Sequence, residues 1–324
     1  MLRKPNQLLW LLAFILGAGL ANAQSYPAKP VKIIVPFVAG GLTDVLTRGL
    51  AQELIKIWGQ QVIVESRPGA NTIIAAELTA KSLPDGYTVL IAYDATVSSN
   101  PYLYSKLPYD PVKDFAPVVN LVALYSMLVA GASFPANTLQ EFIALAKQKP
   151  GELNYGTSGL GSTLHIATEA MSAAAGIKMT HVPYKGVAEI LPAIIAGHIS
   201  VAVTGIQPSL THLRSGRLKA IAFASPRRSP SLPDLPTFTE AGMPGFESRT
   251  WFGMLAPAAT PRPVIDRIAN AVKQAFANKE FLDKYVIGVG MEPLVLMPDE
   301  FAEFLKADRA KYAVQVKNIN VRLD

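Results

Sequence analysis

Residues 31–57 read VKIIVPFVAGGLTDVLTRGLAQELIKI, and this stretch decides the fold. It opens with a short run rich in β-branched residues, Val31 to Phe37, crosses a paired glycine turn, and continues as an amphipathic run from Asp44 to Ile57. β-branched runs favour strands, and apolar residues at helical spacing favour helices. We therefore expect a strand, a tight turn and a helix, the opening unit of a parallel α/β sheet.

The same alternation continues downstream and is repeated in the middle of the chain. The first set adds strands at Gln61 to Glu65 and Thr88 to Ala92 and a helix at Thr72 to Ser82. The second set has strands at Leu153 to Gly156, Met179 to Val182 and Ile199 to Thr204, and helices at Ser162 to Ala175 and Ala188 to Ala196. Two α/β lobes of the same architecture are therefore predicted.

The length supports this division, because 324 residues exceed what one ordinary core holds. Two mostly apolar segments, Phe115 to Ala130 and Trp251 to Pro257, are interpreted as strands that cross between the lobes. The first lobe is predicted to span residues 24–123, completed by part of 225–324, and the second lobe residues 124–224.

The last hundred residues are predicted to contain an irregular loop followed by helices. Ser225 to Gly245 contains five prolines and is predicted to form an irregular surface loop. Pro263 to Ala277 and Pro298 to Lys317 are predicted helices, the second with acidic residues in its first turn.

The N-terminus has the three parts of an export signal. Arg3 and Lys4 precede an apolar run from Leu8 to Leu20, and Ala21-Asn22-Ala23 forms a cleavage site. Residues 1–23 are therefore a predicted signal peptide. The chain has no cysteine, so neither a disulfide nor a lipid-bearing cysteine is expected, and the product should be soluble after export.

Composition narrows the class of protein. Half of the residues are hydrophobic and 17% are charged, which is typical of a globular chain. Removing Arg3 and Lys4 leaves 28 basic against 24 acidic residues, so the net charge falls from +6 to +4. The bases are scattered, which suits attraction of small anions and argues against a nucleic-acid partner.

The loop between the first strand and helix is the strongest candidate for a ligand site. A helix N-terminus carries unpaired amides and partial positive charge, so it holds an anion without arginine or lysine. The candidate residues here are Phe37, Gly40, Gly41, Thr43 and Asp44. The alternative is a plain tight turn in which Thr43 or Asp44 caps the helix.

A second loop repeats the pattern in the other lobe. Its candidate residues are Thr157, Ser158, Gly161, Ser162 and Thr163, at a strand end that leads into a helix. Two such loops can face each other across a cleft. Neither loop matches the glycine fingerprint or the phosphate-binding lysine of a nucleotide site.

Further candidates follow other strand ends. They are Tyr93 and Thr96 in the first lobe, with Asp94 a doubtful partner for an anion, and Pro183, Tyr184, Lys185 and Thr204 in the second. The alternative for the turn at Lys185 is an ordinary turn with a solvated lysine.

No catalytic residue, metal or cofactor is expected. Leu160 stands where a serine hydrolase elbow needs its last glycine, and the four histidines lack metal-ligand spacing. A secreted hydrolase of a small ester or amide, or a ligand sensor that feeds a signalling system, remains an alternative to a binding protein.

Many short motifs together resemble the Bug family, the extracytoplasmic solute receptors of tripartite tricarboxylate transporters in Gram-negative bacteria. They include Val35-Pro36-Phe37, Arg67-Pro68-Gly69-Ala70, Pro84-Asp85-Gly86-Tyr87, Leu107-Pro108-Tyr109-Asp110, His181-Val182-Pro183-Tyr184-Lys185-Gly186 and Trp251-Phe252-Gly253. The resemblance covers essentially the whole mature chain. It implies a type II periplasmic-binding-protein fold, with each lobe a mixed sheet flanked by helices.

The resemblance also implies a function. Such a receptor is a periplasmic monomer that captures a small organic carboxylate between its lobes and passes it to membrane components of the transporter. The chain departs from the family pattern at Val38-Ala39, where the family often has prolines, and at Leu42, where many members have a third glycine. It also has Thr204-Gly205 where many relatives carry an acidic residue. We therefore expect a carboxylate with an uncharged or aromatic tail rather than an amino acid.

Overall fold

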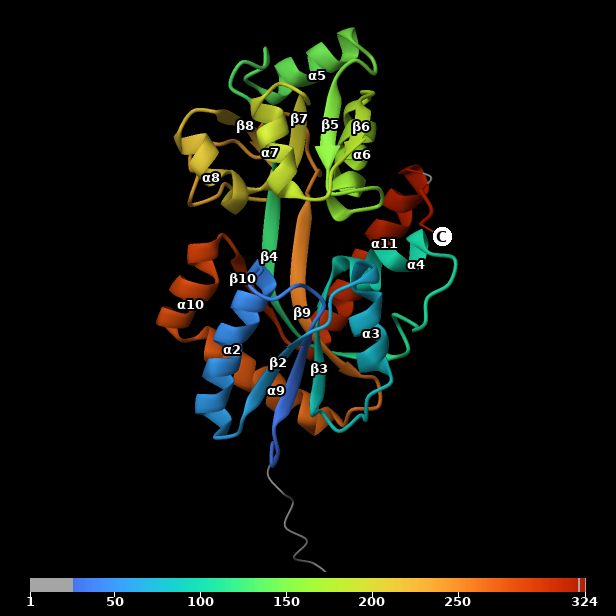
Figure 1. Ribbon diagram of the computed structural model, residues 1–324, viewed down its shortest axis with the longest axis vertical. Coiled ribbons are helices and arrows are strands. Elements are labelled where there is room, and N and C mark those ends of the chain that lie inside the picture. The colour runs from blue at the N-terminus through green and yellow to red at the C-terminus, as the bar shows by residue number, and fades with distance from the viewer. Residues whose placement is uncertain (1–25, 320, 324) are drawn as a thin grey trace, which may run out of the picture.

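The computed structural model describes residues 26–319 and 321–323 of the chain. Two α/β lobes are stacked along the long axis of the molecule (Figure 1), which confirms the predicted fold class. The predicted signal peptide, residues 1–23, lies outside the described residues.

Three parallel strands form the centre of the lower lobe, with β1 (Val31–Val35) between β2 (Val62–Ser66) and β3 (Thr88–Tyr93). The elements around them are α2 (Leu42–Trp58), η1 (Ala70–Thr72), α3 (Ile73–Ala80), η2 (Ala95–Ser99), α4 (Asn100–Leu103), α9 (Arg262–Phe276), α10 (Lys279–Tyr285), η3 (Ile287–Val289) and α11 (Pro298–Ile319). Helices cover both faces of this sheet (Figure 1). Both faces of β1 are therefore buried, which agrees with its nearly continuous apolar sequence.

Neighbouring residues of β1 supply two separate cores. Ile33 packs with Leu46 of α2 and Ile268 of α9 on one face. Ile34 packs with Trp251 and Phe301 on the other. Successive side chains of a strand point to opposite faces, so one apolar strand anchors helices on both sides.

The upper lobe repeats this plan on a smaller scale. Its strands are β5 (Asn154–Thr157), β6 (Thr180–Pro183), β7 (Val201–Gly205) and β8 (Leu218–Phe223), and its helices are α5 (Leu139–Gln148), α6 (Thr163–Ala175), α7 (Val187–Ile195) and α8 (Ile206–Arg214). β5 pairs in parallel with β6 and β7.

One long strand, β4 (Phe115–Gly131), belongs to both lobes. Up to Tyr125 it pairs with β9 (Arg249–Pro257), and from Ser126 it pairs with β7 and β8. β10 (Glu292–Leu296) also pairs with β4 in the lower lobe. The two predicted crossing strands are therefore confirmed, and Figure 1 shows β4 and β9 running side by side through the waist of the molecule.

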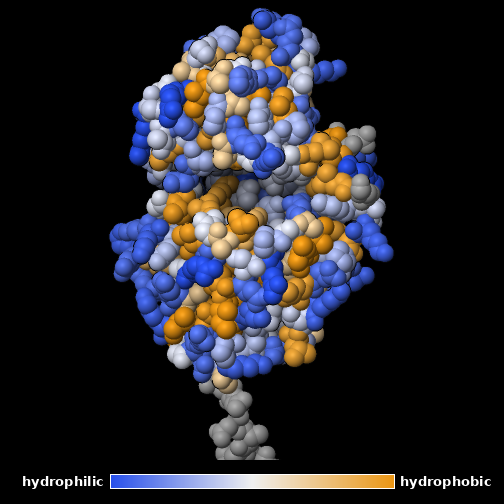
Figure 2. Space-filling view, in the orientation of Figure 1, coloured by the Kyte–Doolittle hydropathy of each residue, from blue (hydrophilic) through white to orange (hydrophobic). Residues whose placement is uncertain are grey.

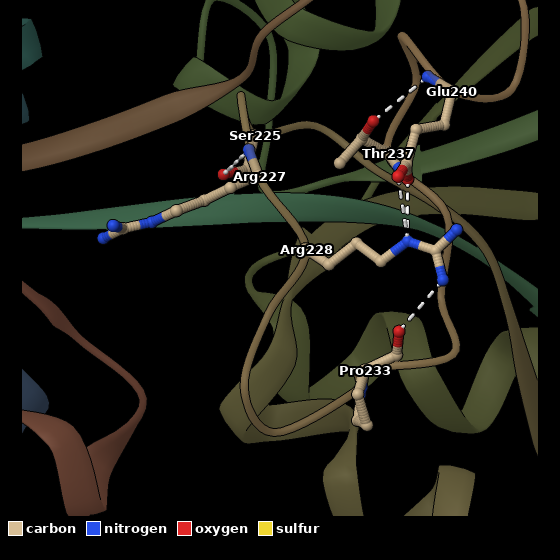
Figure 3. A network of polar contacts seen from close by, with 6 residues as sticks. All are labelled: Ser225, Arg227, Arg228, Pro233, Thr237 and Glu240. Atoms are coloured by element: carbon tan, nitrogen blue, oxygen red, sulfur yellow. Dashed lines mark hydrogen bonds and ion pairs between the residues drawn. The ribbon is translucent and has the colours of Figure 1, made fainter.

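The proline-rich loop between β8 and β9 is held by polar contacts rather than by regular structure (Figure 3). The Arg228 guanidinium donates through Nε to both carboxylate oxygens of Glu240, at 3.0 and 2.9 Å, and through a second nitrogen to the Pro233 carbonyl. The carboxylate also accepts the Thr237 amide at 2.8 Å. The Nε–H is thus shared between the two carboxylate oxygens, and these charge-assisted bonds connect three points of the irregular loop.

Across the part of the chain that the structure describes, no helix is both long enough and apolar enough to span a membrane.

Candidate functional site

The carboxyl ends of the parallel strands in both lobes point toward the space between the lobes. β1 and β3 rise toward it from below, and the arrow of β5 points down into it (Figure 1). Figure 2 shows that the molecular surface is hollowed there. We call this hollow the interlobe cleft. Loops that follow parallel strands at this edge are where α/β proteins hold ligands.

The lower glycine loop, residues 36–41, enters α2 without a side-chain cap. The N-cap residue is Gly41, and no side chain among the described residues bonds to the helix start. The first amides of α2 therefore have no partner within the helix. Gly40 has φ +82°, a left-handed conformation that favours glycine.

Asp44 braces this loop from within the helix. Its Oδ2 accepts the Gly40 amide at 2.9 Å and the Arg48 Nε at 2.8 Å. The hydrogen bond from Arg48, chiefly, lowers the pKa of the carboxyl below its ordinary value. The predicted cap by Thr43 or Asp44 is wrong, since the N-cap is Gly41.

Three aromatic rings pack together beside the lower glycine loop. The Phe37 ring packs edge-on against Tyr93 and Phe252, with centroids 5.2 and 6.0 Å away. Tyr93 is half-buried, and its hydroxyl donates to Asn71 Oδ1 at 2.9 Å. The candidate Thr96 is instead fully buried, and its hydroxyl lies 3.0 Å from that of Thr72 and accepts the Tyr93 amide. Its hydrogen bonds therefore hold lower-lobe elements together.

The upper glycine loop, residues 158–162, uses its own polar groups to keep its shape. The Thr157 hydroxyl donates to the Gly159 carbonyl and lies 2.6 Å from His181 Nε2. The Ser162 hydroxyl caps α6 by accepting the His165 amide at 3.2 Å. The Gly161 amide donates to His165 Nδ1 at 3.1 Å. Ser158 is exposed at the start of the loop.

A stack of rings under the upper loop was not among the sequence candidates. His165 lies over His181 with centroids 4.2 Å apart, and Tyr155 stacks on His181 at 5.1 Å. Burial, followed by the neighbouring His181, lowers the pKa of His165 to about 4. The imidazole is therefore neutral near pH 7 and accepts a hydrogen bond at Nδ1. Ser162 and His165 are three residues apart, which is the spacing of a capping box. Histidine takes the place of the usual glutamate, and it accepts the amide of Gly161, the residue before the cap.

The remaining upper-lobe candidates surround two more helix starts. Tyr184 donates its amide to the Thr157 carbonyl at 2.9 Å and is half-buried, whereas Pro183 and Lys185 are exposed. Thr204, at the end of β7, is fully buried, and its hydroxyl has no hydrogen-bond partner among the described residues.

Three helices that start at the strand ends facing the cleft share one feature. α2, α7 and α8 begin at Gly41, Gly186 and Gly205, and none of the three has a side-chain cap in the described structure. Side chains cap α5, α10 and, at the cleft, α6, whereas α3, α4 and α9 also lack a side-chain cap among the residues described. The cleft helices are therefore distinguished by where their uncapped starts lie and not by the missing cap alone. Amides and dipole ends left uncapped at one edge are suited to a negative group.

Within the described ranges, no cluster of three or more histidine, aspartate or glutamate side chains is placed to hold a metal ion. A cavity of about 770 Å³ lies elsewhere, between the start of α5, β8 and the proline-rich loop of the upper lobe. Its lining contains none of the candidate residues.

Two sheets joined by crossing strands, with ligand-type loops facing one another, define a two-lobed solute-binding protein. The chain belongs to the tripartite tricarboxylate transporter family receptors, whose family model matches residues 46–321. The predicted membership of the Bug family is confirmed by curated relatives. Protein BugT of Bordetella pertussis is 32% identical over 314 residues, which cover 96% of each chain.

Solved structures give the same result. Rpa4515 of R. palustris, solved with adipate, is 32% identical with a TM-score of 0.79, and the match covers 92% of this chain and 99% of that one. MatC from Rhodopseudomonas palustris, solved with bound malate, is 30% identical with a TM-score of 0.74. The match covers 90% of this chain and 100% of that one.

Proposed function

We propose that this protein captures a small organic carboxylate in the interlobe cleft and delivers it to the membrane components of a tripartite tricarboxylate-type transporter. The observation that carries the proposal is the group of uncapped helix starts at Gly41, Gly186 and Gly205. Their amides are already oriented, so an anion is bound without reorganising the loops. Adipate and malate in two relatives support the choice of a carboxylate.

The proposed contacts divide into binding and shaping groups. We propose that Gly41 and Thr43, at the start of α2, bind the anionic end, with Ser158, Tyr184 and Thr204 opposite and Lys185 at the rim. Gly40, whose amide is held by Asp44, shapes the loop. Pro183 fixes the turn beside them. Asp44, Thr96, Thr157, Gly161, Ser162 and Thr163 act by shaping the loops, as their hydrogen bonds to protein atoms suggest.

The tail of the ligand is proposed to be uncharged or aromatic. Phe37, Tyr93 and Phe252 form an apolar cluster beside the lower loop. At the end of β7 the chain has Thr204, an uncharged residue, so this position supplies no carboxylate for a ligand ammonium group. An amino acid would lose that partner, and burying an unpaired charge is costly.

The remaining parts of the proposal follow from the family. The protein acts in the periplasm as a monomer after export, without a lipid anchor, and it binds its ligand without chemical conversion. We propose that residues 24–123, with part of 225–324, form one rigid lobe and residues 124–224 the other. The change of pairing partner in β4 between Tyr125 and Ser126 supports this division.

Isothermal calorimetry tests the proposal with pairs of ligands that differ in charge alone. Adipate, malate and benzoate are titrated beside their neutral amides and beside aspartate and glutamate. We expect at least one carboxylate without an amine to bind, and its amide to bind at least tenfold more weakly. Equal binding of acid and amide, or a preference for aspartate or glutamate, would contradict the proposed site or the proposed ligand class.

A further inference from the structure

Asp94 lies at the junction of the two lobes and is fully buried. Its Oδ1 accepts the Ala95 amide at 2.8 Å and the Thr163 hydroxyl at 3.2 Å. Its Oδ2 accepts the Tyr312 hydroxyl at 2.8 Å. One carboxyl group therefore connects three elements: η2 of the lower lobe, α6 of the upper lobe, and the C-terminal helix α11.

The contact with Thr163 links the lower lobe to the upper glycine loop. Thr163 is the first residue of α6 and directly follows Ser162, the cap that closes the loop. Nearby, Leu103 of α4, Ile166 of α6 and Val316 of α11 form a small apolar cluster that shields the junction. A hydrogen bond to an ionised acceptor is roughly twice as strong as a neutral one, and shielding from water strengthens it further.

The groups around Asp94 make its charge sensitive to pH. Asp308 of α11 is also buried and accepts the Trp251 indole N–H at 2.9 Å. Lys311, on the same helix, donates to the Glu247 carbonyl at 3.1 Å. Burial is the main cause that raises the pKa of Asp94 to about 7, and repulsion from Asp308 is the second. The hydrogen bonds from Tyr312, Ala95 and Thr163 lower the pKa and offset part of this rise. Lys311 and Tyr93 also interact with the Asp94 charge.

We propose that Asp94 is a positioning residue for ligand capture: its ionised carboxylate holds Thr163, and with it the upper glycine loop, against the lower lobe, and its protonation loosens that hold. This inference rests on the proposed function for its link to ligand capture. The junction itself is defined by contacts between residues of the chain.

The absence of cysteine makes the test direct, because two introduced cysteines take spin labels at single sites. Lys147→Cys on α5 and Lys273→Cys on α9 replace exposed residues in opposite lobes. Pulsed electron paramagnetic resonance then gives the interlobe distance from pH 5 to 9 without ligand. The Thr163 bond lowers the pKa of Asp94, so a carboxyl that stays covered by α11 has a higher pKa once that bond is broken, and acid then favours the open state. We expect the ratio of closed to open states to fall by up to about fivefold as the pH drops from 8 to 6. A ratio that rises on acidification would mean that opening hydrates the carboxyl, and it would overturn the proposal.

Matched variants assign this pH effect. Asp94→Asn and Thr163→Val are expected to abolish it, and Thr163→Ser, which keeps the donor, to retain it. Thr168→Val is the control, because Thr168 is a buried threonine of the same helix whose hydroxyl bonds only within α6, to the Leu164 carbonyl. Circular dichroism verifies that each variant folds. An unchanged pH response in Asp94→Asn or Thr163→Val, or none in the parent chain, would overturn the proposal.

Carboxylate titrations on the same proteins separate the two proposals. If no carboxylate binds but the interlobe distance still responds to pH through Asp94, the proposed function fails and the role of Asp94 in positioning the loop stands.

Discussion

The lower and upper glycine loops both join a parallel strand to a helix at the interlobe cleft, but they use their amides differently. The lower loop enters α2 through Gly41 with no side-chain cap. In the upper loop, Ser162 accepts the His165 amide and His165 accepts the Gly161 amide. In the lower loop Asp44 takes the Gly40 amide, but the first amides of α2 have no side-chain partner among the described residues, whereas Ser162 takes one at the start of α6. Since a bound anion needs free donors, the lower loop is the better anion site and the upper loop is a shaped wall opposite it.

The charges near the two loops agree with this division. Below, the Asp44 carboxylate is neutralised by Arg48 at 2.8 Å. Above, the Asp94 carboxyl contacts Thr163 beside the upper loop. An anionic group is therefore expected to sit against Gly41 rather than against Ser162, with the uncharged part of the ligand nearer the upper lobe.

The largest effect is expected from Gly41→Asp. Gly41 has φ −73°, and a Cβ there meets only the Val38 carbonyl, at 3.4 Å, so a side chain fits. Aspartate is a good N-cap, so α2 should keep or gain stability, but its charge occupies the amides that the ligand needs. We expect at least about a 100-fold loss of affinity for the carboxylate that binds in calorimetry, with a melting temperature no lower than that of the parent chain.

Gly41→Asn is the matched control, because it adds a side chain of the same size without the charge. It should weaken binding much less than Gly41→Asp. Equal losses in both variants would mean that bulk, and not charge, excludes the ligand, and the contrast between the loops would then lose its electrostatic basis.

The second effect concerns stability and distinguishes the upper loop. The pKa of His165 is lowered from 6.5 to about 4, so the folded chain excludes a proton that the unfolded chain binds between these values. The free energy of unfolding should therefore fall as the pH drops from 6.5 toward 4, by at most about 3 kcal/mol from this group. His165→Gln keeps an acceptor for Gly161 but does not titrate.

Urea unfolding of both proteins between pH 4 and 8 measures this difference. The parent chain should lose stability relative to His165→Gln on acidification, while contributions from Asp94 and other groups cancel in the comparison. Parallel pH curves for the two proteins would show that the buried imidazole does not hold the loop.

The comparison also explains what the sequence could predict. The strands and helices that the sequence predicts agree with the structure within a few residues, because apolar periodicity and the glycine turns are local signals. The helices α5, α8 and α10 and the strands β8 and β10 are not among the elements predicted from the sequence. Both glycine loops were located for the same reason. The cap formed by Ser162 and His165 was also accessible, since the two residues stand at capping-box spacing.

The contacts that set the roles of individual side chains could not be predicted in the same way. Asp94 meets Tyr312 across 218 positions of the chain, and no local pattern announces such a pair. Thr96 follows a strand end as a ligand residue would, but the π-helical turn η2 buries it against Thr72. Side-chain direction at a strand end depends on the next turn of backbone, which composition does not specify.

A third prediction tests why the upper loop has histidine in its cap. His165→Glu restores the usual capping box and should preserve the helix, but it places a negative charge under the loop. We expect affinity for the bound carboxylate to fall about tenfold relative to His165→Gln, measured by calorimetry at pH 7.5. Equal affinities would indicate that the upper loop lies too far from the anionic end to sense charge.

The smallest effect is expected from Lys185→Ala, at the exposed turn after β6. A charge at the rim of a site attracts the ligand through solvent, so it alters the association rate more than the contacts in the bound state. We expect a loss of about twofold to fivefold at low salt that disappears near 0.5 M salt, where charges are screened within a few ångströms. Lys178→Ala, an exposed lysine before the start of β6 and so away from the strand ends at the cleft, is the control and should change nothing. A loss that persists at high salt would place Lys185 in direct contact with the ligand and would make the upper lobe a second anion site.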